Sequence, residues 1–237
     1  MKVKMTQKPY DVLIFDWDGT LLNSADHIAK CICEGFDAAG LAPPTMDEAR
    51  NIIGLGMVEA IQFLRPGIEH DLIVRIREAY AERFFNKQPT RDDLFDGVME
   101  MLDTAASQGF KLAIATGKSR PGMDVVLRQL DMTSQFHVVR CADETRSKPH
   151  PLMLQEILRE LRLPPERALM IGDTEYDMGM ARAIDMDRLG VSYGVHGRER
   201  LLAHDPIACI DTMHQLHEVI EQAPQRGGDV RLGNRLG

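Results

Sequence analysis

Long apolar segments are missing from this chain of 237 residues. No run approaches the roughly 20 residues that a membrane-spanning helix needs, so we expect no membrane partner. The first residues, MKVKMTQKPYDV, hold no apolar segment before Val12, and we therefore expect no secretory signal. Basic residues are also in deficit, and the formal net charge is −8. Because binding to a phosphate backbone needs a basic face, we expect no nucleic-acid partner.

Cysteine is scarce as well, with only four in the chain. Cys31 and Cys33 are separated by one residue in a helical pattern, which is not the spacing of zinc ligands. We therefore expect reduced thiols in a cytoplasmic protein. The remaining composition, 44% hydrophobic and 27% charged, is that of an ordinary globular protein. The length suits one large domain, or a core with a small insertion.

Short apolar runs alternate with helical patterns over most of the chain. The run at 12–15 and the runs that follow residue 91 have the length and composition of buried strands. We expect strands at 12–15, 111–116, 136–141, 168–174, 188–194 and 207–210, and helices at 97–107, 121–130, 149–161 and 212–222, with a further helix around Met178. Strands that alternate with helices predict the α/β class, a parallel Rossmann-like sheet with right-handed crossovers.

Residues 24–88 break this alternation, because they contain helical patterns only. Ser24 can cap a first helix, and Thr45 with Glu48 forms the sequence of a capping box for a second. The block is therefore an all-helical insertion after the first strand. We expect an α/β core from 1–22 and 91–225, a helical domain at 23–90 and a disordered tail at 226–237.

Polar residues follow several of the predicted strands at the point where each strand ends. The carboxyl ends of parallel strands share one edge of a sheet, where ligands bind. The residues expected to meet there are Asp16, Asp18, Thr116, Gly117, Lys148, Asp173 and Asp177. Clustered carboxylates repel one another unless a cation lies among them, and oxygen ligands favour Mg²⁺. A phosphate group bound to Mg²⁺, the Thr116 hydroxyl, the Gly117 N–H and Lys148 is the natural occupant.

The same residues carry a resemblance to a known family. The segments DWDGT, TG, KP and GDTEYD, in this order and at these spacings, resemble the four motifs of the haloacid dehalogenase superfamily. The similarity runs from about Tyr10 to Ala223, and the pattern is most similar to that of phosphoglycolate phosphatase-like members. The insertion at 23–90 then corresponds to the family's small helical cap. Asn23 stands where these members usually have an aspartate.

The resemblance implies a hydrolase, a phosphatase that forms an aspartyl-phosphate. Asp16 is then the nucleophile, and Asp18 is the general acid and base. Mg²⁺ is expected on Asp16, the backbone carbonyl of Asp18 and Asp173, with Asp177 in support. Thr116, the Gly117 N–H and Lys148 would hold the phosphate, and Lys148 would neutralise its developing charge. Asp18 favours phosphoryl transfer over dehalogenation, because family members that cleave carbon–halogen bonds lack this residue.

The cap is expected to select the substrate, a small phosphorylated metabolite. Gly54 lies in a loop that would face the cleft, and Arg50 beside it would meet a substrate carboxylate or else lie in solvent. Phosphoglycolate is the first candidate substrate. A β-phosphoglucomutase-like mutase and an inactive binding or regulatory protein remain open, as does the choice between a monomer and a homodimer.

Overall fold

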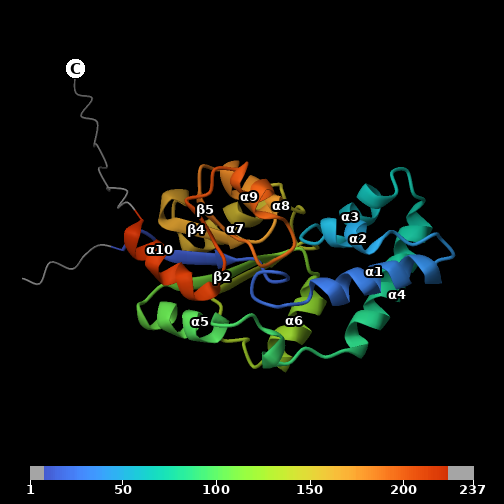
Figure 1. Ribbon diagram of the computed structural model, residues 1–237, viewed down its shortest axis with the longest axis horizontal. Coiled ribbons are helices and arrows are strands. Elements are labelled where there is room, and N and C mark those ends of the chain that lie inside the picture. The colour runs from blue at the N-terminus through green and yellow to red at the C-terminus, as the bar shows by residue number, and fades with distance from the viewer. Residues whose placement is uncertain (1–7, 224–237) are drawn as a thin grey trace, which may run out of the picture.

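A six-stranded parallel sheet forms the centre of the protein in the computed structural model, which describes residues 8–223 (Figure 1). The strand order is β3-β2-β1-β4-β5-β6. The strands are β1 (Val12–Phe15), β2 (Lys111–Thr116), β3 (Val138–Cys141), β4 (Ala168–Gly172), β5 (Asp187–Val191) and β6 (Ala208–Ile210). The predicted α/β class and parallel sheet are confirmed.

Helices cover both faces of this sheet. They are α5 (Val98–Ser107), α6 (Arg120–Gln129), α7 (Leu152–Leu161), α8 (Glu175–Arg182), α9 (Arg198–Leu202) and α10 (Leu216–Gln222), with short 3₁₀ turns at Arg91–Asp93, Pro165–Arg167 and Met213–Gln215. Alternate side chains of β1 belong to different cores, since Leu13 and Phe15 pack on one face while Val12 and Ile14 pack on the other. Because side chains alternate between two buried faces, every residue of β1 is apolar, as expected for a strand that is covered on both faces.

The register of β1 sets the position of the residues that follow it. Phe15 pairs with Ile114 of β2 on one side and with Ile171 of β4 on the other. The backbone N–H of Asp16 donates to the Ile171 carbonyl at 2.9 Å. Asp16 therefore lies level with the carboxyl ends of both neighbouring strands, at the edge where ligands bind.

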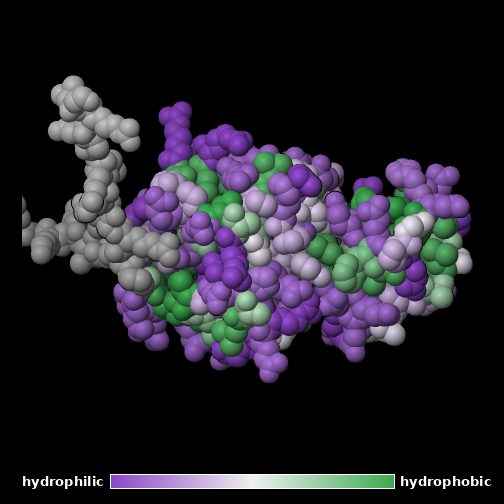
Figure 2. Space-filling view, turned by 90° about the horizontal axis from the view of Figure 1, so that it is seen from above, coloured by the Kyte–Doolittle hydropathy of each residue, from purple (hydrophilic) through white to green (hydrophobic). Residues whose placement is uncertain are grey.

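The helical insertion lies to one side of the sheet (Figure 1). Its helices are α1 (Ala25–Ala38), α2 (Met46–Asn51), α3 (Met57–Leu64) and α4 (His70–Asn86), and α1 packs against both α2 and α4. The all-helical cap is confirmed, and so is the capping box at Thr45 and Glu48. In Figure 2 the cap forms a narrower lobe beside the larger core, with hydrophobic residues at its surface near the junction.

Some predicted details differ from the structure. The strand β3 begins at Val138 rather than 136, and α7 begins at Leu152 rather than near Pro149. The short helix α9 was not predicted, because five residues are too few for a helical period to show in the sequence. The boundaries expected for the cap stay a prediction, and the tail predicted at 226–237 lies outside the described residues. Among residues 8–223, no helix has both the length and the hydropathy to span a membrane.

Candidate active site

Asp16 and Lys148 form a buried ion pair at the edge of the sheet. Lys148 Nζ lies 2.8 Å from Asp16 Oδ1 and 2.6 Å from Asp177 Oδ1, and all three side chains are almost completely buried. Burial alone would lower the pKa of Lys148, but the two carboxylates outweigh it and hold that pKa above its usual value. The ammonium group is therefore charged, and it links the end of β1 to the first turn of α8.

Asp173 follows β4 and is fixed by neighbouring donors. The Thr20 hydroxyl donates to Oδ1 at 2.8 Å, and the backbone N–H of Val195 donates to Oδ2 at 2.8 Å. Two glycines make room for this carboxylate, because a Cβ at Gly19 or Gly194 would lie 2.1 or 2.2 Å from its atoms. Gly19 also has φ +82°, a conformation that glycine adopts without strain.

The three carboxylates form a cluster that suits a divalent cation. Oxygen atoms of Asp16, Asp173 and Asp177 lie within 4.8 Å of one another. Burial, reinforced by Asp177, raises the pKa of Asp173 to about 7, and burial also raises the pKa of Asp16 despite Lys148. Asp16 Oδ2 is buried and has no hydrogen-bond partner in the described part of the chain. Buried anions that lack enough positive charge, and an oxygen without a partner, fit a site for Mg²⁺.

Asp18 is held by two groups, Ser24 and Lys118, that were not predicted to belong to the site. Ser24 Oγ donates to Asp18 Oδ1 at 2.6 Å, and Lys118 Nζ donates to both carboxylate oxygens at 2.9 Å. Ser24 occupies the position before α1 as predicted, but its side chain makes no capping hydrogen bond because it is engaged with Asp18. Lys118 directly follows Thr116 and Gly117 in the sequence, and this position beside two predicted site residues was the one sign that it could reach the site.

Thr116 and Gly117 lie where β2 ends, close to the cap. Thr116 is buried, and its hydroxyl oxygen accepts from the Lys118 N–H at 3.2 Å. A Cβ at Gly117 would lie 2.6 Å from the carbonyl oxygens of Gly54 and Leu55. The cap loop therefore passes directly over this strand end, and only glycine allows so close an approach.

Comparison with known proteins decides the family. A family model described as haloacid dehalogenase-like hydrolase matches residues 13–191. The chain belongs to this family. A phosphoglycolate phosphatase of Vibrio vulnificus (strain YJ016) is 26% identical over 224 residues, covering 91% of this chain and 98% of that protein. The tyrosine-protein kinase PtkA of Mycobacterium tuberculosis (strain H37Rv) is 32% identical over 189 residues, which cover 79% of this chain and 63% of that protein.

A comparison with a solved structure shows that the fold is shared over nearly the whole chain. The hydrolase from Pseudomonas syringae superposes with a TM-score of 0.82 and 22% identity, covering 92% of this chain and all of that chain. The family model and the relatives named phosphoglycolate phosphatase confirm the resemblance to phosphoglycolate phosphatase-like members. Together the family and the phosphatases among its relatives identify the chain as a hydrolase of the phosphatase type.

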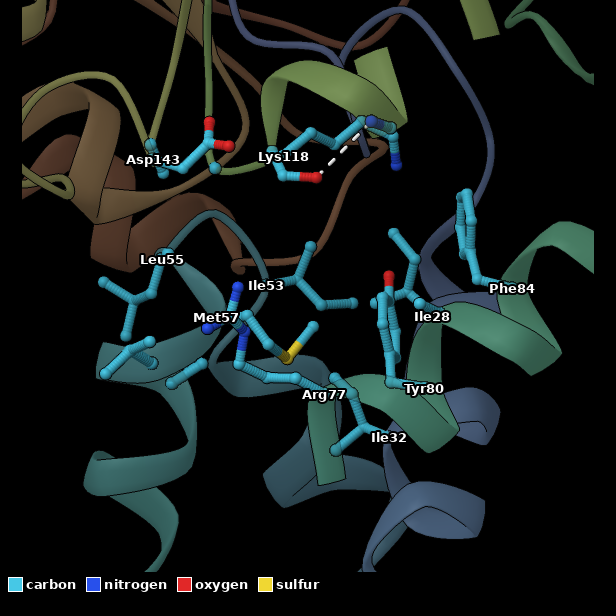
Figure 3. Close-up of a pocket in the computed structure, with 18 of the residues that line it drawn as sticks. Ile28, Ile32, Ile53, Leu55, Met57, Arg77, Tyr80, Phe84, Lys118 and Asp143 are labelled. Carbon is cyan, nitrogen blue, oxygen red and sulfur yellow. Dashed lines mark hydrogen bonds between the residues drawn. The ribbon is translucent and has the colours of Figure 1, made fainter. Parts of the chain in front are cut away.

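A cavity of about 640 Å³ opens between the cap and the core of this hydrolase. Asp16, Asp18 and Gly117 line it, and so does Gly54, as the sequence analysis expected. Arg50 does not line it. Its guanidinium group instead pairs with Asp26 and Asp47 on the surface of the cap, which favours the second of the two predicted alternatives, a position in solvent. Figure 3 shows that another cap arginine, Arg77 of α4, extends into the cavity.

Asn51, at the end of α2, anchors the cap to the core. Its carbonyl oxygen accepts from the Tyr176 hydroxyl at 3.0 Å and lies 3.1 Å from His196 Nε2. Its side-chain oxygen accepts from Arg200 at 2.6 Å. The Gly56 N–H adds a hydrogen bond to Ser147 Oγ at 2.8 Å. These bonds hold the loop of the cap over the strand ends, which completes the walls of the site.

Proposed function

We propose that this hydrolase is a Mg²⁺-dependent phosphatase that cleaves a small phosphomonoester through an aspartyl-phosphate on Asp16. The observation that supports the proposal most directly is the environment of the two carboxylate oxygens of Asp16. One carboxylate oxygen is bound by Lys148, while the other is buried without a hydrogen-bond partner among residues 8–223. A carboxylate oxygen with no hydrogen bond is available as a ligand or as a nucleophile.

In the first step, Asp16 attacks phosphorus, the bond from phosphorus to the ester oxygen breaks, and Asp18 gives its proton to the leaving oxygen. In the second step, a water molecule attacks the same phosphorus atom, Asp18 takes a proton of the water, the bond from phosphorus to the Asp16 oxygen breaks, and inorganic phosphate leaves. Lys148 stabilises the charge that develops on the phosphoryl oxygens, and Thr116 and the Gly117 N–H hold those oxygens.

Mg²⁺ would be held by Asp16, the backbone carbonyl of Asp18 and Asp173, with Asp177 holding Lys148 beside it. When bound, the ion supplies positive charge that offsets the repulsion between the substrate phosphate and the carboxylates. The rest of the chemistry belongs to the protein. Asp16 bonds to phosphorus, Asp18 moves the proton, and the cap shields the closed site from bulk solvent.

Release of phosphate from p-nitrophenyl phosphate tests the proposal. We expect turnover with Mg²⁺, loss with EDTA and loss in Asp16→Asn. Asp211→Asn, which replaces an exposed aspartate that pairs with Arg198 on the surface, is the matched control and should leave turnover unchanged. Equal activity with and without EDTA, or in Asp16→Asn, would overturn the proposal. A requirement for a sugar bisphosphate, with retention of the phosphoryl group, would indicate a mutase instead.

Phosphoglycolate is the first natural candidate substrate, because relatives that match over nearly their whole length carry that name. A phosphometabolite panel compared by kcat/KM tests this choice. A cytoplasmic location, and a monomer or homodimer, remain predictions.

A further inference from the structure

The walls of the cavity above Asp16 and Asp18 are mainly apolar. The α1 face contributes Ile28 and Ile32, and the loop before α3 contributes Ile53 and Leu55. These side chains point into the cavity in Figure 3. A volume of about 640 Å³ belongs to the range of pockets that enclose drug-sized ligands. The glycolate part of phosphoglycolate is small and polar, so it would leave most of this apolar surface uncovered.

The α4 wall is aromatic. Tyr80 and Phe84 are stacked, with ring centroids 5.6 Å apart and an angle of 21° between the planes. Phe85 also lines the cavity although 41% of it is exposed. Aromatic rings attract planar groups by dispersion and by their quadrupoles. This wall therefore favours a leaving group with a flat, apolar body.

Arg77 gives the cavity one cation on the cap side. Figure 3 shows its side chain reaching from α4 to the neighbourhood of Met57, inside the cavity. The carboxylates of Glu59, Glu78 and Asp143 also line the cavity, but Arg77 forms an ion pair with none of them, nor with any other described residue. Arg50 and Arg83 of the cap form ion pairs with carboxylates, and Arg75, which forms none with a described residue, lies outside the cavity. An unpaired guanidinium group that faces a binding cavity is available to a planar anion such as a carboxylate.

We propose that the substrate is a phosphomonoester whose leaving group has a planar apolar body and carries a carboxylate that Arg77 binds. This inference rests on the proposed function and specifies its substrate class. The phosphate lies at the strand ends, the body lies against the isoleucines and α4, and the carboxylate lies beside Arg77.

The test compares three alkyl phosphates whose leaving alcohols are of similar basicity: 4-carboxybenzyl phosphate, benzyl phosphate and phosphoglycolate. We expect kcat/KM to be highest for 4-carboxybenzyl phosphate, by about tenfold or more over each of the others, since a group that fills an apolar pocket and a charged hydrogen bond each contribute on this scale. Phosphoglycolate as the best of the three would overturn the inference.

Two pairs of variants locate the effect. Arg77→Gln should remove the preference for the carboxylated ester and leave kcat/KM for benzyl phosphate unchanged within about twofold. The control is Arg75→Gln, at an exposed residue of α4 outside the cavity, which should change kcat/KM for neither ester. Phe85→Ser should lower kcat/KM for both benzyl esters by about threefold or more, while Phe63→Ser, also exposed but outside the cavity, should not. A carboxylate preference that survives in Arg77→Gln would contradict the assignment of this residue.

Binding separates this inference from the proposed function. Calorimetry with 4-carboxybenzylphosphonate and benzylphosphonate, which cannot be hydrolysed at the P–C bond by this chemistry, measures the cavity without turnover. We expect the carboxylated compound to bind about tenfold more tightly, and only when Arg77 is present. If no ester is hydrolysed, the proposed phosphatase fails, and the affinities still decide the substrate class. Equal affinities for the two phosphonates would overturn the inference even in an active phosphatase.

Discussion

Lys118 Nζ lies 2.9 Å from each carboxylate oxygen of Asp18. The same atom lies 4.3 Å from the ring centroid of Phe84, a residue of the cap. One side chain of the core therefore contacts both the proposed proton carrier and the cap. Both oxygens of Asp18 accept from the ammonium group, which fixes the orientation of the carboxylate that carries the proton in the proposed mechanism.

Replacing Lys118 by methionine should lower kcat by about tenfold or more, because Asp18 loses the group that fixes its orientation. The loss should be larger for an alkyl phosphate, whose leaving oxygen needs a proton, than for p-nitrophenyl phosphate. The control is Lys111→Met, at the opposite end of β2, which should have no effect. An equal loss with both esters would place the effect of Lys118 in the second step, which both esters share, and an unchanged kcat would show that Lys118 does not act through Asp18.

Lys148→Met should destabilise the protein strongly in the absence of metal. Lys148 is the ammonium group between Asp16 and Asp177, and its removal leaves two buried carboxylates without that partner. Breaking a buried ion pair by removing one member costs about 3–5 kcal/mol. Urea denaturation in EDTA measures this loss in the free energy of unfolding.

A surface lysine provides the control for this variant. Lys30 has a side chain that is 70% exposed and pairs with Glu34. Lys30→Met should change the free energy of unfolding by about 0.5 kcal/mol or less. A cost for Lys148→Met that is no larger than this would mean that the buried pair does not stabilise the fold.

Mg²⁺ should raise Tm more at about pH 8 than at about pH 6. Burial raises the pKa of Asp173 to about 7, above the value of about 3.9 expected in the unfolded chain. In the metal-free protein, ionisation of this group therefore destabilises the fold progressively as the pH rises from about 4 to about 7. Mg²⁺ binds the ionised form, so its stabilising effect is greatest above that pKa.

Scanning calorimetry with Mg²⁺ and with EDTA at both pH values checks this prediction. We expect the Mg²⁺-induced rise in Tm to be larger by about 3 °C or more at the higher pH. Asp173→Asn should reduce the difference, because the amide does not titrate and only Asp16 of the cluster then remains with a pKa raised by burial. The same rise at both pH values would contradict a role for the acidic cluster in binding the metal.

Tyr176→Phe should weaken the attachment of the cap to the core with little effect on the fold. The variant loses the hydrogen bond from the Tyr176 hydroxyl to the Asn51 carbonyl but keeps the ring. Closure then becomes less favourable by about 1 kcal/mol, so kcat/KM should fall by about fivefold. Steady-state kinetics measures this change, and Tyr193→Phe, which loses a hydrogen bond to Thr20 within the core, separates cap closure from a general loss of hydrogen bonding. An unchanged kcat/KM in Tyr176→Phe would show that this bond does not contribute to closure.

Local sequence signals were enough to predict the class of fold, and three of the four carboxylates expected at the strand ends, Asp16, Asp173 and Asp177, form one cluster. Val12–Phe15 is apolar on both faces because helices cover both faces of a parallel sheet, and this leaves a recognisable run. Asp16, Asp173 and Lys148 follow strands or loops that reach the same edge, so their meeting follows from parallel topology. Local rules of this kind also placed the capping box at Thr45.

Which residues line the cavity depends on how the folded chain packs. Arg50 and Arg77 are both arginines on cap helices, and no local pattern says which of them turns inward. The packing of α1 against α2 and α4 determines the difference. Asp26 of α1 forms an ion pair with Arg50, whereas Arg77 lines the cavity. Ser24 was likewise predicted to cap α1, but in the folded chain its hydroxyl donates to Asp18 instead. Side-chain partners that lie far apart in the sequence are fixed by the packing of whole elements, and so they appear only when the chain is folded.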